Sequence, residues 1–167
     1  QQYRRKSHQL DLYLEPGEIK VEKGAFIAYS GNSGGLLTMR EVVIVSACRT
    51  AIGAFGGTLR DLNGATIAST AMQAAVQRAG IAPAVIDDVR FGCCLEHHDT
   101  LNVTRVAALM AGIPETVPAV TINRVCISGM EAVVSGAAMI QAGMADVILA
   151  GGVEHMSGVP YVVPAAR

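Results

Sequence analysis

From Met39 onward, the apolar residues of this chain form short β-branched runs that alternate with longer alanine-rich stretches. The short runs predict strands at residues 41–47, 88–94, 118–122 and 146–150. The longer stretches predict helices over residues 64–79, from Asn102 as a cap to Met110, and over residues 128–142. The predicted order is therefore β-α-β-α-β-α-β.

This order predicts an α/β fold, with a mixed or parallel sheet between helical layers. Asn63 can cap the first helix, and Gly80 and Pro83 end it. The strand at residues 41–47 is expected to be buried. The helix at residues 128–142 consists mostly of glycine, alanine, valine and methionine, so we expect it to be buried on most sides.

The composition changes near Met39, which divides the chain into a leader, residues 1–38, and a main part, residues 39–167. The leader is polar and charged, and the glycine-rich stretch 31–35 joins it to the apolar part. We interpret Met39 as a natural start and the leader as unrelated to the main part.

Charge and cysteine usage narrow the class of protein. The net charge is −1, with no basic stripe and no acidic tail, so we expect neither nucleic acid nor a membrane as a partner. The spacing of Cys48, Cys93, Cys94 and Cys126 gives no disulfide framework and no zinc pattern. No apolar run reaches the length of a membrane span, and we expect a cytoplasmic, reducing location.

The strongest chemical signal is the segment 123–133, which places Cys126 between a predicted strand and a predicted helix. The first amides of a helix have no intrahelical partner, and the positive end of its dipole lies there, so both effects favour a thiolate. A sharp strand-to-helix turn also presents its side chain outward, as in hydrolases with a nucleophile elbow. By residue type alone, a lone cysteine such as Cys126 is usually a small buried hydrophobic residue.

The segment around Cys126 resembles the nucleophile motif of thiolases, and three further segments agree in the same order. They are residues 41–53, residues 111–119 with their Gly-Ile-Pro and Val-Pro-Ala elements, and residues 151–161 with Gly-Gly-Val-Glu-His-Met-Ser. The resemblance extends over residues 39–167. It implies a thiolase-like layered fold of which only the N-terminal part is present.

The resemblance also implies an acyl-CoA acyltransferase with Cys126 as its catalytic nucleophile. The cysteine would take an acyl group as a thioester and pass it to CoA in thiolysis, or to a second acyl-CoA in Claisen condensation. The Cys126 amide would help to stabilise the oxyanion. A coenzyme A thioester is then the substrate, no cofactor is expected to be tightly bound, and the family implies a homo-oligomer.

Thiolases activate the nucleophile with a histidine, a second cysteine and an asparagine-bound water from their C-terminal half. None of His8, His97, His98 and His155 matches that histidine. We therefore expect the chain to be incomplete for turnover, and we assign His155 a packing or hydrogen-bonding role. Two alternatives stay open: a non-catalytic oligomerising fragment, and a ketoacyl-synthase-like condensing enzyme.

The remaining chemical side chains carry weaker signals. Residues 93–99 contain cysteine, glutamate, histidine and aspartate, but neighbours on a strand point to opposite faces, so we predict no metal site. We expect Asp146 to open a strand and Glu154 to make structural hydrogen bonds. Arg49 and Arg60 could bind phosphate, although loop arginines are usually solvated.

The leader has a resemblance of its own. Residues 12–17, 21–24 and 27–35 are similar to part of a lysostaphin-type zinc endopeptidase domain. That family continues into a His-x-His motif, which is missing here, and His8 is the leader's single histidine. A peptidoglycan endopeptidase would therefore lack its metal ligands.

Overall fold

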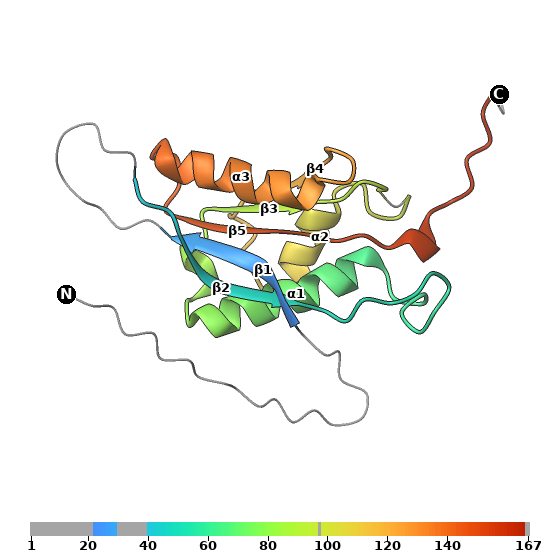
Figure 1. Cartoon of the computed structure of the whole chain (residues 1–167), viewed down its shortest axis with the longest axis horizontal. Helices are drawn as coiled ribbons and strands as arrows, with labels where there is room; N and C mark the ends of the chain where they lie inside the picture. The colour runs from blue at the N-terminus through green and yellow to red at the C-terminus, as the bar shows by residue number, and fades with distance from the viewer. Residues whose placement is uncertain (1–21, 30–39, 97, 166–167) are drawn as a thin grey trace, which may run out of the picture.

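The fold is a five-stranded sheet with helices on both faces (Figure 1). The computed structural model describes residues 22–29, 40–96 and 98–165. Its elements are, in chain order, β1 (Glu22–Tyr29), β2 (Val43–Arg49), α1 (Gly64–Ala79), η1 (Pro83–Val85), β3 (Asp88–Gly92), α2 (Val103–Met110), β4 (Ala119–Ile122), α3 (Ser128–Gln141), β5 (Val147–Gly152) and η2 (Met156–Gly158).

The strand order is β2-β1-β5-β3-β4. β3 pairs in parallel with both β4 and β5, whereas β1 pairs antiparallel with both β2 and β5. The strands β2, β5, β3 and β4 therefore run in one direction, and β1 runs against them. The predicted α/β class with a mixed sheet is confirmed.

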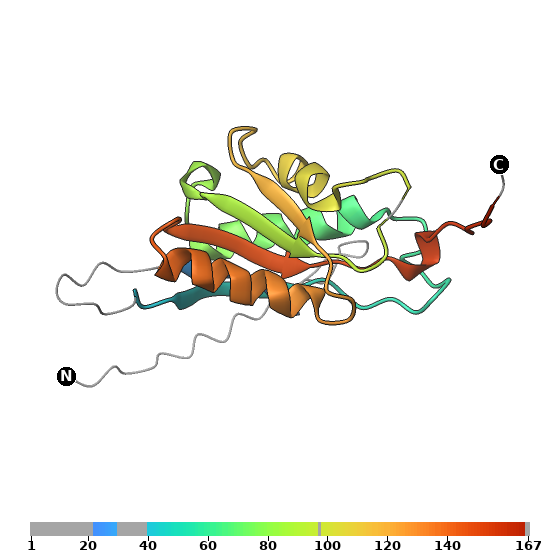
Figure 2. The same ribbon diagram turned by 90° about the horizontal axis from the view of Figure 1, so that it is seen from above.

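β5 supplies side chains to both layers because successive residues of a strand point to opposite faces. Leu149 belongs to a core cluster with residues of α1 and α2, whereas Ile148 and Ala150 pack with Ile140 of α3. Figure 2 shows α3 on one side of the sheet and α1 and α2 on the other. Both cores meet at this one strand.

The helix ends agree closely with the sequence pattern. The Asn63 side chain accepts a hydrogen bond from the Thr66 amide, and Gly80 ends α1 in the left-handed conformation, as predicted. Asn102 caps α2 through the Arg105 amide and also donates to the Ala119 carbonyl of β4. The cap of α2 therefore also ties that helix to its strand.

Two predictions of burial were wrong. Val43, Ile44 and Val45 are 39%, 57% and 45% exposed, because β2 lies at the edge of the sheet. α3 buries one narrow stripe, and Met130 and Val134 on its other sides are 66% and 56% exposed. A helix that packs on one face of a sheet has its remaining sides open unless another element covers them.

β1 was not predicted, since its residues belong to the segment that the sequence assigned to the leader. The structure places this strand between β2 and β5, inside the sheet. The division of the chain at Met39 stays a prediction.

Candidate active site

Cys126 lies in the turn that joins β4 to α3, residues 123–127. β3, β4 and β5 are parallel, so their carboxyl ends, at Gly92, Ile122 and Gly152, meet at one edge of the sheet. The turn starts directly after β4 at that edge. In α/β sheets, this edge is where ligands usually bind.

Side chains hold this turn in one shape. The Asn123 amide donates to the Cys94 carbonyl at 2.9 Å, and its oxygen accepts from the Val125 amide at 3.0 Å. Ser128 Oγ accepts from the Arg124 amide at 2.9 Å and donates to the Val125 carbonyl. Arg124 also pairs with Glu131 in the first turn of α3, at 3.1 Å. The backbone before Cys126 is thus fixed at several points.

Val125 adopts a left-handed conformation, with φ of 52°. This conformation is costly for a β-branched residue, and such strain often marks a functional site. It turns the chain sharply just before Cys126, which is exposed. The predicted outward presentation of the Cys126 side chain is confirmed.

The first turn of α3 rests directly on the backbone of the sheet. A Cβ atom at Gly92 would lie 2.2 Å from the Ser128 carbonyl carbon, and one at Gly152 would lie 3.2 Å from Gly129 Cα. Glycine is therefore required at the end of β3 if the first turn of α3 is to lie this close to the sheet. The requirement at Gly92 was not predicted, because nothing in the local pattern reveals which segment packs against it.

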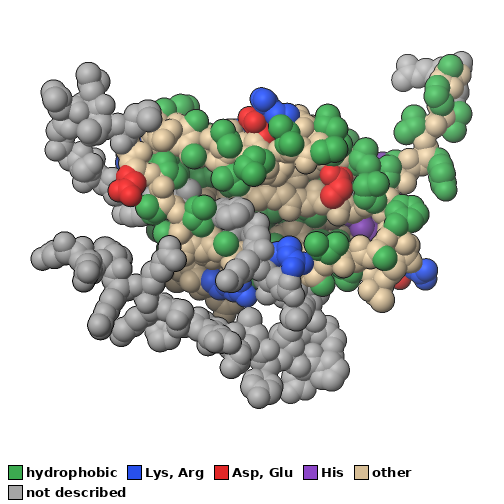
Figure 3. Space-filling model, in the orientation of Figure 1, with side chains coloured by type: hydrophobic (Ala, Val, Ile, Leu, Met, Phe, Trp, Pro, Cys, Tyr) green, Lys and Arg blue, Asp and Glu red, His purple; other side chains and the backbone are tan. Residues whose placement is uncertain are grey.

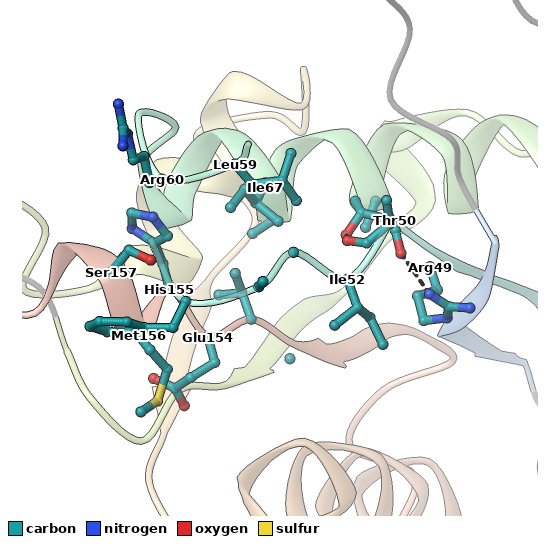
Figure 4. Close-up of a pocket in the computed structure, with 18 of the residues that line it drawn as sticks. Arg49, Thr50, Ile52, Leu59, Arg60, Ile67, Glu154, His155, Met156 and Ser157 are labelled. Atoms are coloured by element: carbon teal, nitrogen blue, oxygen red, sulfur yellow. Dashed lines mark hydrogen bonds between the residues drawn. The ribbon is translucent and has the colours of Figure 1, made fainter. Parts of the chain in front are cut away.

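A cavity of about 540 Å³ opens at the same edge of the sheet. Its walls come from the end of β2 and the segment after it, from the first half of α1 and from the loop after β5, and it does not include the 123–127 turn. Figure 4 shows His155 and Ser157 beside the segment with Leu59 and Arg60. The Gly56 amide donates to Ser157 Oγ at 2.9 Å, which closes one side.

Four residues with predicted roles line this cavity: His155, Arg49, Arg60 and Glu154. His155 is 8% exposed, which agrees with a packing role. Arg49 donates to the Thr50 carbonyl, whereas Arg60 pairs with Asp61 at 3.5 Å and is largely exposed. Phosphate binding by either arginine stays a prediction.

Glu154 has the structural role that was predicted. Its carboxylate accepts from the amides of Cys94 and Leu95 at 2.9 and 3.0 Å. Burial, reinforced by the nearby negative charge of Glu154, raises the pKa of Cys93 to about 12. Burial likewise raises the pKa of Cys48. Both cysteines are therefore held as thiols.

Asp146 lies just before β5, where it pairs with Arg40, and its amide donates to Asp87. Glu154 lies beyond the other end of β5, so the two acids do not form a carboxylate pair. Among the described residues, no group of three or more histidine, cysteine or acidic side chains could hold a metal ion. His97 lies outside the described residues. No helix in the described part of the chain could span a membrane.

Comparison with known proteins identifies the family. The model for the thiolase N-terminal domain matches residues 42–167. The chain belongs to the thiolase N-terminal domain family. The family predicted from the sequence motifs is thereby confirmed, for a segment that contains both Cys126 and the loop after β5.

Two of the similar proteins are named acetyl-CoA acetyltransferases. An acetyl-CoA acetyltransferase of Syntrophomonas wolfei is 50% identical over 128 residues, 77% of this chain and 32% of that protein. The human mitochondrial acetyl-CoA acetyltransferase is 44% identical over 126 residues, 75% of this chain and 30% of that protein.

The fold agrees with this family. The crystal structure of the Bacillus anthracis acetyl-CoA acetyltransferase matches with a TM-score of 0.67 and 35% identity. The match covers 89% of this chain and 32% of that one. The chain thus spans about a third of the length of these thiolase relatives.

The four cysteines are expected to react in a fixed order with iodoacetamide. At about pH 8, Cys126 should be alkylated first, because it is exposed, whereas Cys48 and Cys93 should resist. A raised pKa leaves little thiolate below it, so Cys93 labelling should increase only towards strongly alkaline pH or on unfolding. Peptide mapping at timed intervals measures this. Labelling of Cys93 as fast as Cys126 would contradict the described burial.

The substitution Gly92→Ala should disturb the Cys126 turn. The added Cβ overlaps the Ser128 backbone, so we expect a loss of about 3 kcal/mol or more in the free energy of unfolding. Gly129→Ala is the matched control, because its Cβ would meet nothing closer than 3.9 Å and alanine favours a helix. Urea unfolding checks both variants. Equal stability of the two would show that the backbones do not touch.

Proposed function

We propose that this chain accepts an acyl group on Cys126 from an acyl-CoA. The Cys126 thiolate attacks the thioester carbonyl carbon, and a new C–S bond forms. The bond from that carbon to the CoA sulfur then breaks, and CoA leaves as a thiolate that takes up a proton. The products are an acyl-cysteine thioester and free CoA, so one difficult transfer becomes two easier ones.

The observation that carries this proposal is the exposed Cys126 on a strained turn at the start of α3. The positive end of the helix dipole lies here and favours the negative charge of an oxyanion that forms nearby. Similar proteins are named acetyl-CoA acetyltransferases, which supports an acetyl or other short acyl thioester as the donor. These names favour a thiolase over the ketoacyl-synthase alternative.

The second half of the reaction is thiolysis by CoA or Claisen condensation with another acyl-CoA. We propose that this chain alone does not turn over at a sustained rate. No residue of the chain matches the histidine, second cysteine or asparagine that the thiolase resemblance assigns to nucleophile activation and to the oxyanion.

Coenzyme A thioesters enter as substrates, and no tightly bound cofactor is part of the proposal. A cytoplasmic location is proposed with it.

We also propose that the chain forms a homo-oligomer through the apolar side of α3. Met130 and Val134 are each more than half exposed, although both are apolar. Figure 3 shows hydrophobic side chains gathered along the face that α3 forms. Apolar groups concentrated on one helix favour a protein contact. A non-catalytic oligomerising role would use the same surface.

Acylation should be specific to Cys126. Incubation with acetyl-CoA should add one acetyl group, and peptide mapping should locate it on Cys126. The variant Cys126→Ser should lose that rapid adduct, whereas Cys94→Ser, the matched control at a half-buried cysteine, should keep it. An adduct on Cys94 alone, or none on a Cys126 that still reacts with iodoacetamide, would overturn the proposal.

The oligomer should depend on the apolar side of α3. Val134→Glu places a charge among these apolar groups and should shift the chain to a smaller species in size-exclusion chromatography with light scattering. Val162→Glu is the control, because Val162 is 81% exposed and lies beyond η2, away from α3. If the parent chain is monomeric, or if both variants behave alike, the surface is not an interface.

A further inference from the structure

The Glu154 carboxylate binds the backbone of the loop after β3 through both of its oxygens. Oε2 accepts from the Cys94 amide at 2.9 Å, and Oε1 accepts from the Leu95 amide at 3.0 Å. Hydrogen bonds to an ionised acceptor are roughly twice as strong as neutral ones. Figure 4 shows this carboxylate pointing away from Leu59 and Ile67. Glu154, in the loop after β5, therefore holds the loop after β3 in place.

The loop after β3 is also bonded to the turn that carries Cys126. The Asn123 side chain donates to the Cys94 carbonyl at 2.9 Å, and its oxygen accepts from the Val125 amide at 3.0 Å. Cys94 thus has its amide on Glu154 and its carbonyl on Asn123. Because peptide units are planar and stiff, a shift at the Cys94 amide is passed on to its carbonyl.

The last bond in this series supports a strained residue. Val125 has a φ of 52°, which a β-branched residue keeps only where the surrounding bonds over-determine it. Its carbonyl is held by Ser128 Oγ from α3, and its amide is held by Asn123. The first support belongs to the helix, whereas the second depends on Cys94 for its orientation. A weaker anchor at Cys94 would therefore loosen the residue just before Cys126.

We propose that Glu154 is a positioning residue for Cys126, acting through Cys94 and Asn123 on the backbone of the turn. It sets the direction in which the turn presents the sulfur to an acyl donor, so this role rests on the proposed acyl transfer to Cys126. A carboxylate suits the task because it offers two acceptors to two adjacent amides. A side-chain amide of the same size offers one oxygen, and its NH₂ group would face the second amide donor.

Hydrogen exchange in the full chain tests the positioning without the reaction. In Glu154→Gln, exchange of the Val125 amide should become about tenfold faster, which corresponds to the loss of one charge-assisted hydrogen bond. Amides of α1 should exchange as in the parent chain, because the opening is local. NMR measures both. If the α1 amides accelerate as much as Val125, Glu154 only stabilises the fold and the proposal is wrong.

Glu96→Gln is the matched control. It removes a negative charge from the same loop and leaves both amide bonds of Glu154 in place. The Val125 amide of this variant should exchange at the parent's rate. Equal acceleration in Glu96→Gln and Glu154→Gln would mean that charge, rather than the two hydrogen bonds, controls the turn, and would overturn the proposal.

A double variant tests the route through Asn123. Asn123→Ala removes the acceptor of the Val125 amide itself. If Glu154 acts through Asn123, adding Glu154→Gln to Asn123→Ala should change Val125 exchange by less than about twofold, because residues in one network are not additive. Two effects that multiply would show that Glu154 acts on the turn by another route.

Acetyl transfer tests the consequence for chemistry. With acetyl-CoA, Glu154→Gln should acetylate Cys126 about tenfold more slowly, because transfer requires an oriented sulfur. Alkylation of Cys126 by iodoacetamide requires mainly exposure and should stay within about twofold of the parent. Intact mass and peptide mapping measure both rates. Acetylation at the parent's rate would overturn the positioning role. If the parent itself takes no acetyl group, the proposed function fails, and the exchange rates alone decide the role of Glu154.

Discussion

The direct contact between the end of β3 and the first turn of α3 is the constraint on which this structure depends. Gly92 leaves no room for a side chain beneath Ser128, so the helix starts against the backbone of the sheet. This contact fixes where α3 begins, and the turn that carries Cys126 must close the short distance from β4. The exposure of Cys126 and the strain at Val125 both result from that closure.

Much of the fold could be predicted from the sequence, because several element ends have local causes. Asn63 and Gly80 bound α1 as predicted, since a side-chain cap and a left-handed glycine act within a few residues. Cys126 was placed correctly on a strand-to-helix turn. The strand ends shifted by about two residues, which is the usual uncertainty of such boundaries.

The features that the sequence did not reveal depend on contacts between distant segments. β1 was missed because its strand forms only against β2 and β5. The exposure of Met130 was misjudged because composition does not show how many faces of a helix are covered. The cavity joins two loops about a hundred residues apart, as the bond from Gly56 to Ser157 shows, and no local pattern encodes that meeting.

Glu154 connects the cavity to the turn that carries Cys126 through hydrogen bonds. Its carboxylate holds the Cys94 amide, the Cys94 carbonyl holds the Asn123 side chain, and that side chain holds the Val125 amide. Because Glu154 also lines the cavity, three hydrogen bonds in series connect the cavity wall to the residue before Cys126. A shift of Glu154 at the cavity wall therefore has a hydrogen-bonded route to the backbone of the turn that carries Cys126.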